Sequence, residues 1–242
     1  MLSLNASDFF DIRQTLISLA EKGEKVEMTT IYKGVFLTQK ISHIEIKKDC
    51  VQFMPPHQIC CVKPEQRIYI HHDSLPKSVV TSVTAIDLGT GLVSSSHLNY
   101  IDHIWKPRKN DRVQPKQPLR AVMSIAHWSI SASIADLSVN GIGLLIYGMV
   151  NKGLNIEVSQ SVQTGLRLPG TNMPLALSGR IARINQFGNS AMVSLGIETY
   201  PNDKQSRQLK SYISSRQAEI LEELSQIVRY ALEPAQTKDM FF

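Results

Sequence analysis

Residues 128–146, WSISASIADLSVNGIGLLI, decide how this chain folds. Two runs of mainly apolar and small residues, 128–135 and 141–146, stand on either side of the short polar segment Asp136–Asn140. Runs of this length that end at Asp, Asn and Gly are typical of strands joined by a turn. The stretch therefore predicts a β-hairpin whose turn carries a carboxylate, a hydroxyl and a glycine.

More strand-like runs lie on both sides of this hairpin. From residue 119 onward they cover 119–125, 128–135, 141–146, 162–168, 175–184 and 191–197. Between residues 26 and 103 shorter runs alternate with turn-forming clusters, at 35–37, 44–46, 51–53, 68–70, 79–85 and 91–93. Short strands with regular turn signals favour a small barrel or sandwich over a parallel α/β sheet. We therefore expect a mainly β protein with two small β-barrel domains, the C-terminal one six-stranded.

A helix is expected at each end of the strand-rich region. Near the N-terminus, Ser7 or Asp8 can cap a helix that Gly23 ends, with the apolar residues Phe9, Ile12, Leu16 and Leu19. From about 203 to 232 a long amphipathic helix carries the stripe Leu209, Ile213, Ile220, Leu224, Ile227 and Ala231. The stripe fits packing against the chain's own barrel. It also leaves open pairing with a partner helix or with a second copy as a homodimer.

The segment 105–118 differs from its surroundings. Its Lys and Arg residues alternate with Pro107, Pro115 and Pro118, and few of its side chains can join a core. We therefore expect an N-terminal domain at 1–104, an interdomain linker at 105–118, and a β-barrel with the C-terminal helix at 119–242.

Composition excludes several classes of protein. The 242 residues are 43% hydrophobic and 19% charged, as in ordinary soluble globular proteins. The net charge of +5 is modest and the basic residues are scattered, which argues against a nucleic-acid partner. No apolar run approaches the ~20 residues of a transmembrane segment, and no secretory signal is apparent. A cytoplasmic protein, or one peripheral to a membrane, is expected.

The sequence contains no recognisable catalytic or metal-binding motif. Cys50, Cys60 and Cys61 form no C-x-x-C pair, and the seven histidines show no metal-ligand spacing. No pair of carboxylates or Ser/His arrangement is typical of catalysis. We expect a binding protein without a metal ion or cofactor, not an enzyme.

The chemistry of the polar residues suits a ligand with both phosphate and guanine. Arg108 and Arg112 are four residues apart in the linker, and Arg pairs bidentately with phosphate or with the O6/N7 edge of guanine. Asp136 can accept hydrogen bonds from N1–H and N2–H₂ on the other edge of guanine. Two alternatives remain open at this point. Asp136 and Ser138 can belong to a simple Asx-type turn, and the two arginines can be solvated linker charges.

With both segments considered, the chain resembles the PilZ family of cyclic di-GMP receptors. The family pattern is R-x-x-x-R, a gap of some twenty to thirty residues, and then [D/N]-x-S-x-x-G. Arg108 and Arg112 match the first half; Asp136, Ser138 and Gly141 match the second. The resemblance covers roughly residues 105–200. The region before it is similar to the N-terminal split-β-barrel domain of flagellar-brake proteins.

The resemblance implies a role for each matching residue. Arg108 and Arg112 would clamp the phosphates and contact guanine, so that 105–118 is a ligand-binding linker. Asp136 would accept from a guanine edge, Ser138 would fix the turn, and Gly141 would allow a close approach. Arg183 lies where family members often place a planar side chain beside the base.

We therefore expect a cyclic di-GMP-binding effector that changes the orientation of its two domains and regulates an unidentified protein partner. The output is open between motility, biofilm and virulence functions, and one ligand or a stacked pair can bind. The alternative is a non-enzymatic adaptor that acts through protein contacts without a nucleotide. Its support is the long amphipathic helix at the C-terminal end.

Overall fold

The computed structural model describes residues 6–41, 43–47, 50–54, 61–87, 89–101, 111–126, 128–148, 156–171, 173–186 and 192–232. The chain separates into two compact units. The first comprises Met1–Tyr32, Phe36–Pro107 and Glu222–Phe242, and the second comprises Lys33–Val35 and Arg108–Leu221. The predicted domain boundaries at 104 and 118 stay a prediction.

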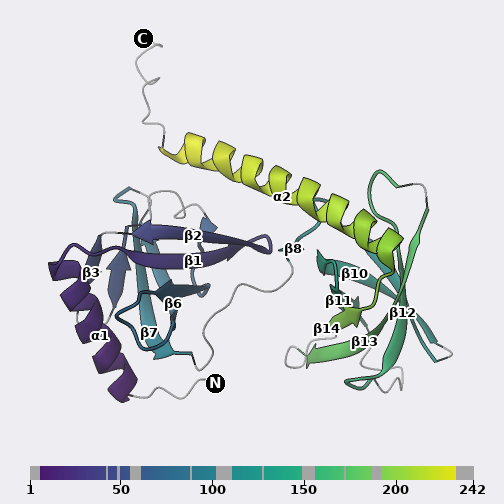
Figure 1. Cartoon of the computed structure of the whole chain (residues 1–242), viewed down its shortest axis with the longest axis horizontal. Coiled ribbons are helices and arrows are strands. Elements are labelled where there is room, and N and C mark those ends of the chain that lie inside the picture. The colour runs from purple at the N-terminus through teal and green to yellow at the C-terminus, as the bar shows by residue number, and fades with distance from the viewer. Residues whose placement is uncertain are drawn as a thin grey trace, which may run out of the picture. The chain divides into compact units, whose positions relative to one another are not determined.

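The first unit is a curved, open sheet with one helix against it (Figure 1). Its described strands are β1 (Val26–Tyr32), β2 (Val35–Ile41), β3 (Ile44–Ile46), β4 (Val51–Phe53), β5 (Arg67–His71), β6 (Val79–Asp87) and β7 (Leu92–Tyr100), in the order β2-β1-β5-β6-β7-β4-β3. Helix α1 (Ala6–Glu21) packs against β3 and β7. Its Ile12, Leu16 and Leu19 are buried in the core, as their helical spacing predicts. Strand β1 was not among the strands predicted from the sequence.

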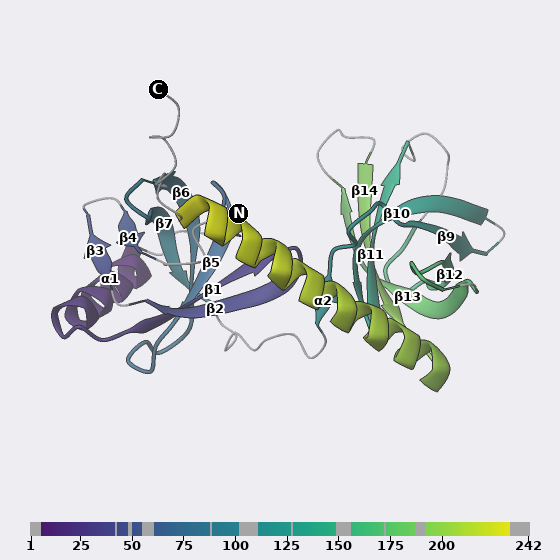
Figure 2. The same cartoon turned by 90° about the horizontal axis from the view of Figure 1, so that it is seen from above.

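The second unit is a closed barrel. Its strands are β8 (Arg112–Val113), β9 (Arg120–Ile125), β10 (Trp128–Ser138), β11 (Gly141–Tyr147), β12 (Ser161–Leu166), β13 (Leu175–Gln186) and β14 (Met192–Thr199). They pair in the order β11-β14-β13-β12-β9-β10-β8, and β11 also pairs with β10, which closes a ring of six strands (Figure 2). Alternate residues point inward, so that Met123, Leu144 and Leu177 are fully buried. The predicted six-stranded barrel is confirmed.

The short strand β8 continues the side of β10 that β9 occupies. β10 pairs with β9 at residues 128–133 and with β8 at residues 137–138. Between β8 and β9, residues 114–119 contain Pro115 and Pro118, which lack the N–H that a continuous ladder needs. Part of the segment that the sequence assigned to a linker is therefore a strand of the barrel sheet.

Helix α2 (Asp203–Leu232) begins at a capping box. Asn202 Oδ1 accepts a hydrogen bond from the N–H of Gln205 at 3.0 Å, and Gln205 Oε1 accepts one from the N–H of Asn202 at 2.9 Å. Leu209, Ile213 and Ile220 are buried on one face. The mainly β fold with an N-terminal and a long C-terminal helix is confirmed, and the helix bounds agree with the predicted 203–232.

Candidate functional site

The hairpin between β10 and β11 is tighter than the sequence indicates. Ser138 pairs directly with Gly141, so the turn contains only Val139 and Asn140, and Asp136 lies on the strand. Ser138 is buried, and its hydroxyl donates to the Gly141 carbonyl at 3.1 Å. A Cβ at Gly141 would lie 3.2 Å from Ser138 Oγ and 3.3 Å from the carbonyl oxygen of Ile197. Close approach therefore explains the glycine at this position.

Two β-bulges direct a carboxylate and a guanidinium to the outer face of the barrel. In β10 the register shifts between Ile134 and Asp136, and in β13 it shifts between Ile181 and Arg183. Ile134 and Ile181 are buried in the core. Without the extra residue, side chains two positions later would also point inward, because the side-chain period of a strand is two. The bulges turn Asp136 and Arg183 outward instead.

The two bulged residues lie in one cross-strand row. Asp136 pairs with Gly143, Gly143 with Gly196, and Gly196 with Arg183. The row therefore crosses four strands, β10, β11, β14 and β13, at spacings of about 4.8 Å. Its two central positions are glycines, so the Asp136 carboxylate can lie over the backbone of Gly143, and Gly196 adds no side chain beside Arg183. Because these two positions add no side chains, a flat ring system can approach the two charged groups closely.

Gly143 also makes room for Asp136. A Cβ at this position would lie 2.7 Å from Asp136 Oδ2 and 3.0 Å from its Cγ. The carboxylate therefore lies across the Cα of Gly143, in space that any other residue would fill. Gly143 and Gly196 were not predicted as site residues, because their role depends on cross-strand pairing.

Strand β8 brings Arg112 to this row. Arg112 pairs with Ser138 across the β8–β10 ladder. Its Nη1 donates to Asp136 Oδ1 at 3.1 Å, and about a third of each side chain is exposed, 31% for Arg112 and 32% for Asp136. Charge-assisted hydrogen bonds of this kind hold both groups in a defined geometry. Arg108 lies outside the described residues.

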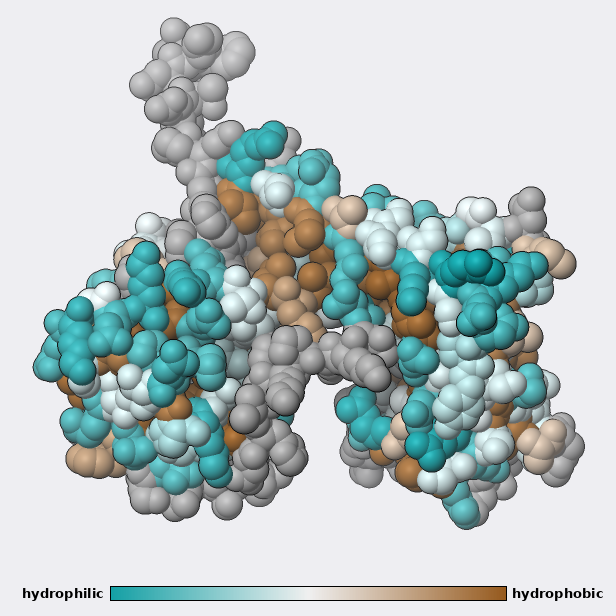
Figure 3. Space-filling model, in the orientation of Figure 1, coloured by the Kyte–Doolittle hydropathy of each residue, from teal (hydrophilic) through white to brown (hydrophobic). Residues whose placement is uncertain are grey.

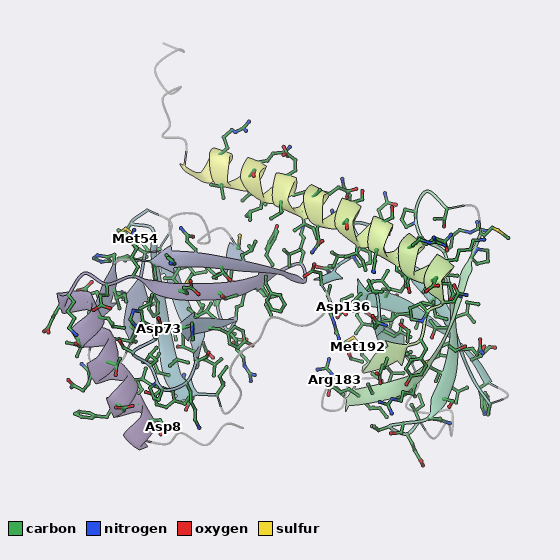
Figure 4. All side chains as sticks on the ribbon, in the orientation of Figure 1. Asp8, Met54, Asp73, Asp136, Arg183 and Met192 are labelled. Atoms are coloured by element: carbon green, nitrogen blue, oxygen red, sulfur yellow. The ribbon has the colours of Figure 1, made fainter. Side chains whose placement is uncertain are left out.

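A surface cavity of about 360 Å³ includes the same region. It is lined by Arg112, Asn140, Gly141, Ile142, Ala182, Arg183, Gly196, Ile197 and Glu198. At its edge, Arg180 Nε donates to Glu198 Oε2 at 2.7 Å, and this contact raises the pKa of Arg180. Figure 4 shows Asp136 and Arg183 on the same side of the second unit. The predicted residues Arg112, Asp136, Ser138, Gly141 and Arg183 thus form one cluster.

Residues 106–215 match the family model of the PilZ domain. The chain contains a PilZ domain. The match includes both halves of the R-x-x-x-R and D-x-S-x-x-G pattern, so the resemblance stated from the sequence is confirmed there. The barrel and the first part of α2 lie within the PilZ domain, whereas the sheet of the first unit lies before it. No curated protein sequence matches the chain.

Several solved structures are similar to most of the chain. One is YcgR from Escherichia coli in complex with c-di-GMP, at 16% identity and a TM-score of 0.42, covering 93% of this chain and 96% of that chain. Another is the K. pneumonia MrkH–c-di-GMP complex, at 10% identity and a TM-score of 0.46, covering 88% and 96%. A third is the inhibitor of motility (MotI/DgrA) from Bacillus subtilis, at 14% identity and a TM-score of 0.41. This match covers 81% of this chain and 97% of that chain.

Within the described ranges, no three His, Cys, Asp or Glu side chains gather where a metal ion could bind. No helix in the part of the chain that the structure describes is long and apolar enough to cross a bilayer.

Proposed function

We propose that this chain is an effector that binds cyclic di-GMP at the outer face of its PilZ domain. The observation that carries the proposal is the Arg112–Asp136 pair beside Gly143 and Gly196, which add no side chains of their own. A guanidinium serves phosphate or the O6/N7 edge of guanine, and a carboxylate accepts from the N1–H and N2–H₂ edge. The guanidinium and the carboxylate that a guanine nucleotide requires are therefore hydrogen-bonded to each other in this site.

The remaining site residues have supporting roles in this proposal. Arg183 approaches the ligand from the opposite end of the row and contacts a base or phosphate. Ser138 and Gly141 keep the hairpin compact, so that Asp136 and Arg112 stay adjacent. Arg108, four residues before Arg112, supplies the second phosphate-binding guanidinium.

Isothermal titration calorimetry with cyclic di-GMP tests the proposal. Cyclic di-AMP is the matched ligand, because it keeps the two phosphates and replaces guanine by adenine, whose edge lacks the O6 acceptor. We expect binding of cyclic di-GMP near micromolar concentrations and at least tenfold weaker binding of cyclic di-AMP. Equal affinities would show that the site reads phosphate alone, and no binding of either ligand would refute the proposal.

Binding is proposed to act through the orientation of the two units, with a protein partner responding to the change. A ligand held by Arg108 and Arg112 orders the segment that joins the units, which restricts their relative motion. Small-angle scattering with and without cyclic di-GMP tests this step. Scattering curves that superimpose at saturating ligand would contradict it. Non-enzymatic action, cytoplasmic location and a homodimer stay predictions.

A further inference from the structure

Helix α2 carries a buried arginine within its apolar stripe. Arg216 is only 3% exposed, between the buried residues Ile213 and Ile220. A buried charge is costly unless it is paired or hydrogen-bonded. The chain therefore retains a guanidinium at a position where the helix pattern expects an apolar side chain.

The contacts of Arg216 lead to the strand that carries Arg112. Arg216 Nε donates to the main-chain carbonyl of Gln114 at 3.0 Å, across 102 residues of sequence. Gln114 directly follows β8, whose Val113 is fully buried. Arg216 Nη1 also donates to Glu219 Oε2 at 3.0 Å, one helical turn further along α2. The guanidinium thus links a carbonyl at the end of β8 to a carboxylate on the helix.

Packing alone does not explain this arginine. An open surface pocket of about 390 Å³ borders it, lined also by Lys116, Gly170, Tyr212 and Ser215. An apolar side chain could fill this position on the helix face, but it could not donate to the Gln114 carbonyl and to Glu219. In Figure 3 hydrophilic residues line the upper edge of α2. The hydrogen bond to β8 is its distinguishing contact.

We propose that Arg216 is a positioning residue that couples the ligand site to α2. β8 is held from two sides, by the β10 ladder and the Arg112–Asp136 pair at one end and by Arg216 at the other. When Arg112 is immobilised by a ligand, β8 and the Gln114 carbonyl are immobilised with it, which strengthens the anchorage of α2. Coupling of two sites is reciprocal, so a looser α2 weakens ligand binding by the same factor. The inference rests on the proposed function and identifies α2 as an element that responds to the ligand.

Hydrogen–deuterium exchange of the full chain, with and without saturating cyclic di-GMP, gives a test that needs no variant. We expect the ligand to slow exchange in the segment of α2 around Arg216, beyond the slowing at Arg112 itself. Binding without any change in α2 would overturn the coupling. If the parent chain does not bind cyclic di-GMP at all, the proposed function is refuted. This outcome is distinct from binding without a change in α2, which refutes the coupling alone.

Two substitutions separate positioning from stability. Glu219→Gln removes the charged partner of Arg216, and Glu222→Gln is its matched control, because Glu222 accepts a hydrogen bond from Gln226 Nε2 on the exposed surface. Arg216→Lys keeps the positive charge but lacks the guanidinium that bonds with both Gln114 and Glu219. Leu209→Ala is its control for helix packing, because Leu209 is buried on the same helix. Coupling predicts weaker cyclic di-GMP affinity, by at least about fivefold for Arg216→Lys, with a smaller loss for Glu219→Gln. A purely structural role would lower the melting temperature in Arg216→Lys and Leu209→Ala alike and leave both affinities equal, which would overturn the proposal.

Discussion

The sharpest test of the site geometry is Gly143→Ala, because it adds a single methyl group under the Asp136 carboxylate. The new Cβ would lie 2.7 Å from Asp136 Oδ2, whereas ordinary contacts begin at about 3.4 Å, so the carboxylate must move by about 0.7 Å. The 3.1 Å hydrogen bond from Arg112 then lengthens past its useful range. Hydrogen bonds to charged groups contribute about 1.5–3 kcal/mol, which corresponds to a roughly 10- to 150-fold loss of affinity for cyclic di-GMP.

Folding is expected to change little in the same variant. The Arg112–Asp136 pair is about one-third exposed, and ion pairs of this kind contribute only about 0–1 kcal/mol. Alanine also costs less conformational entropy than glycine in a strand, by about 0.5–1 kcal/mol. The melting temperature should therefore stay within a few degrees of the parent's while the affinity falls.

Gly165→Ala provides the matched control for this experiment. Gly165 also lies in a barrel strand, but the nearest atom to an added Cβ is the Val122 carbonyl oxygen at 3.8 Å, an ordinary contact. Calorimetry and thermal unfolding are measured on both variants and on the parent. If Gly143→Ala binds cyclic di-GMP within twofold of Gly165→Ala, then Asp136 does not contact the ligand in the way that the row implies.

Three further predictions concern stability. Gly179→Ala should lower the free energy of unfolding by about 1–3 kcal/mol in urea, because its Cβ would overlap the main-chain oxygen of Glu198; an unchanged midpoint would contradict this packing. Asn202→Ala removes the N-cap of α2 and should cost about 1 kcal/mol, visible as an earlier loss of helical circular dichroism on heating. Burial and the 2.6 Å hydrogen bond to Asp11 raise the pKa of Tyr100 above its ordinary value. The contribution of Tyr100 to the free energy of unfolding is therefore complete below about pH 10 and is lost as the pH rises through the folded-state pKa. Tyr100→Phe should therefore flatten the decline of the free energy of unfolding at alkaline pH.

The local spacing of apolar and polar residues was sufficient to predict both helices and most strands. The i, i+4, i+7 spacing of Ile12, Leu16 and Leu19 correctly predicted a buried helix face. The bounds of α2 followed from the polar residues before it and the apolar stripe within it. The alternation of apolar residues located the six barrel strands, since a closed barrel buries every second side chain.

Features that depend on pairing between distant strands were not predictable from one sequence. Asp136 reads as a turn residue because it begins a polar segment, yet it belongs to β10 and is turned outward by a bulge. Arg112 reads as part of a linker because prolines surround it, yet it forms two residues of strand with Val113. Arg216 breaks the apolar stripe, and only the fold reveals Gln114 as its partner. Each case requires knowledge of which strand lies alongside.

The paired bulges have a consequence for chain length. Ala135 and Ala182 fall between residues with cross-strand partners, Ala135 after Ile134 and Ala182 after Ile181. Removing either alanine would shorten its strand by one residue, yet the residues before and after it would keep their inward or outward facing. These two positions are therefore natural points at which a single-residue deletion can be absorbed. Elsewhere in the same strands, the loss of one residue would exchange core and surface.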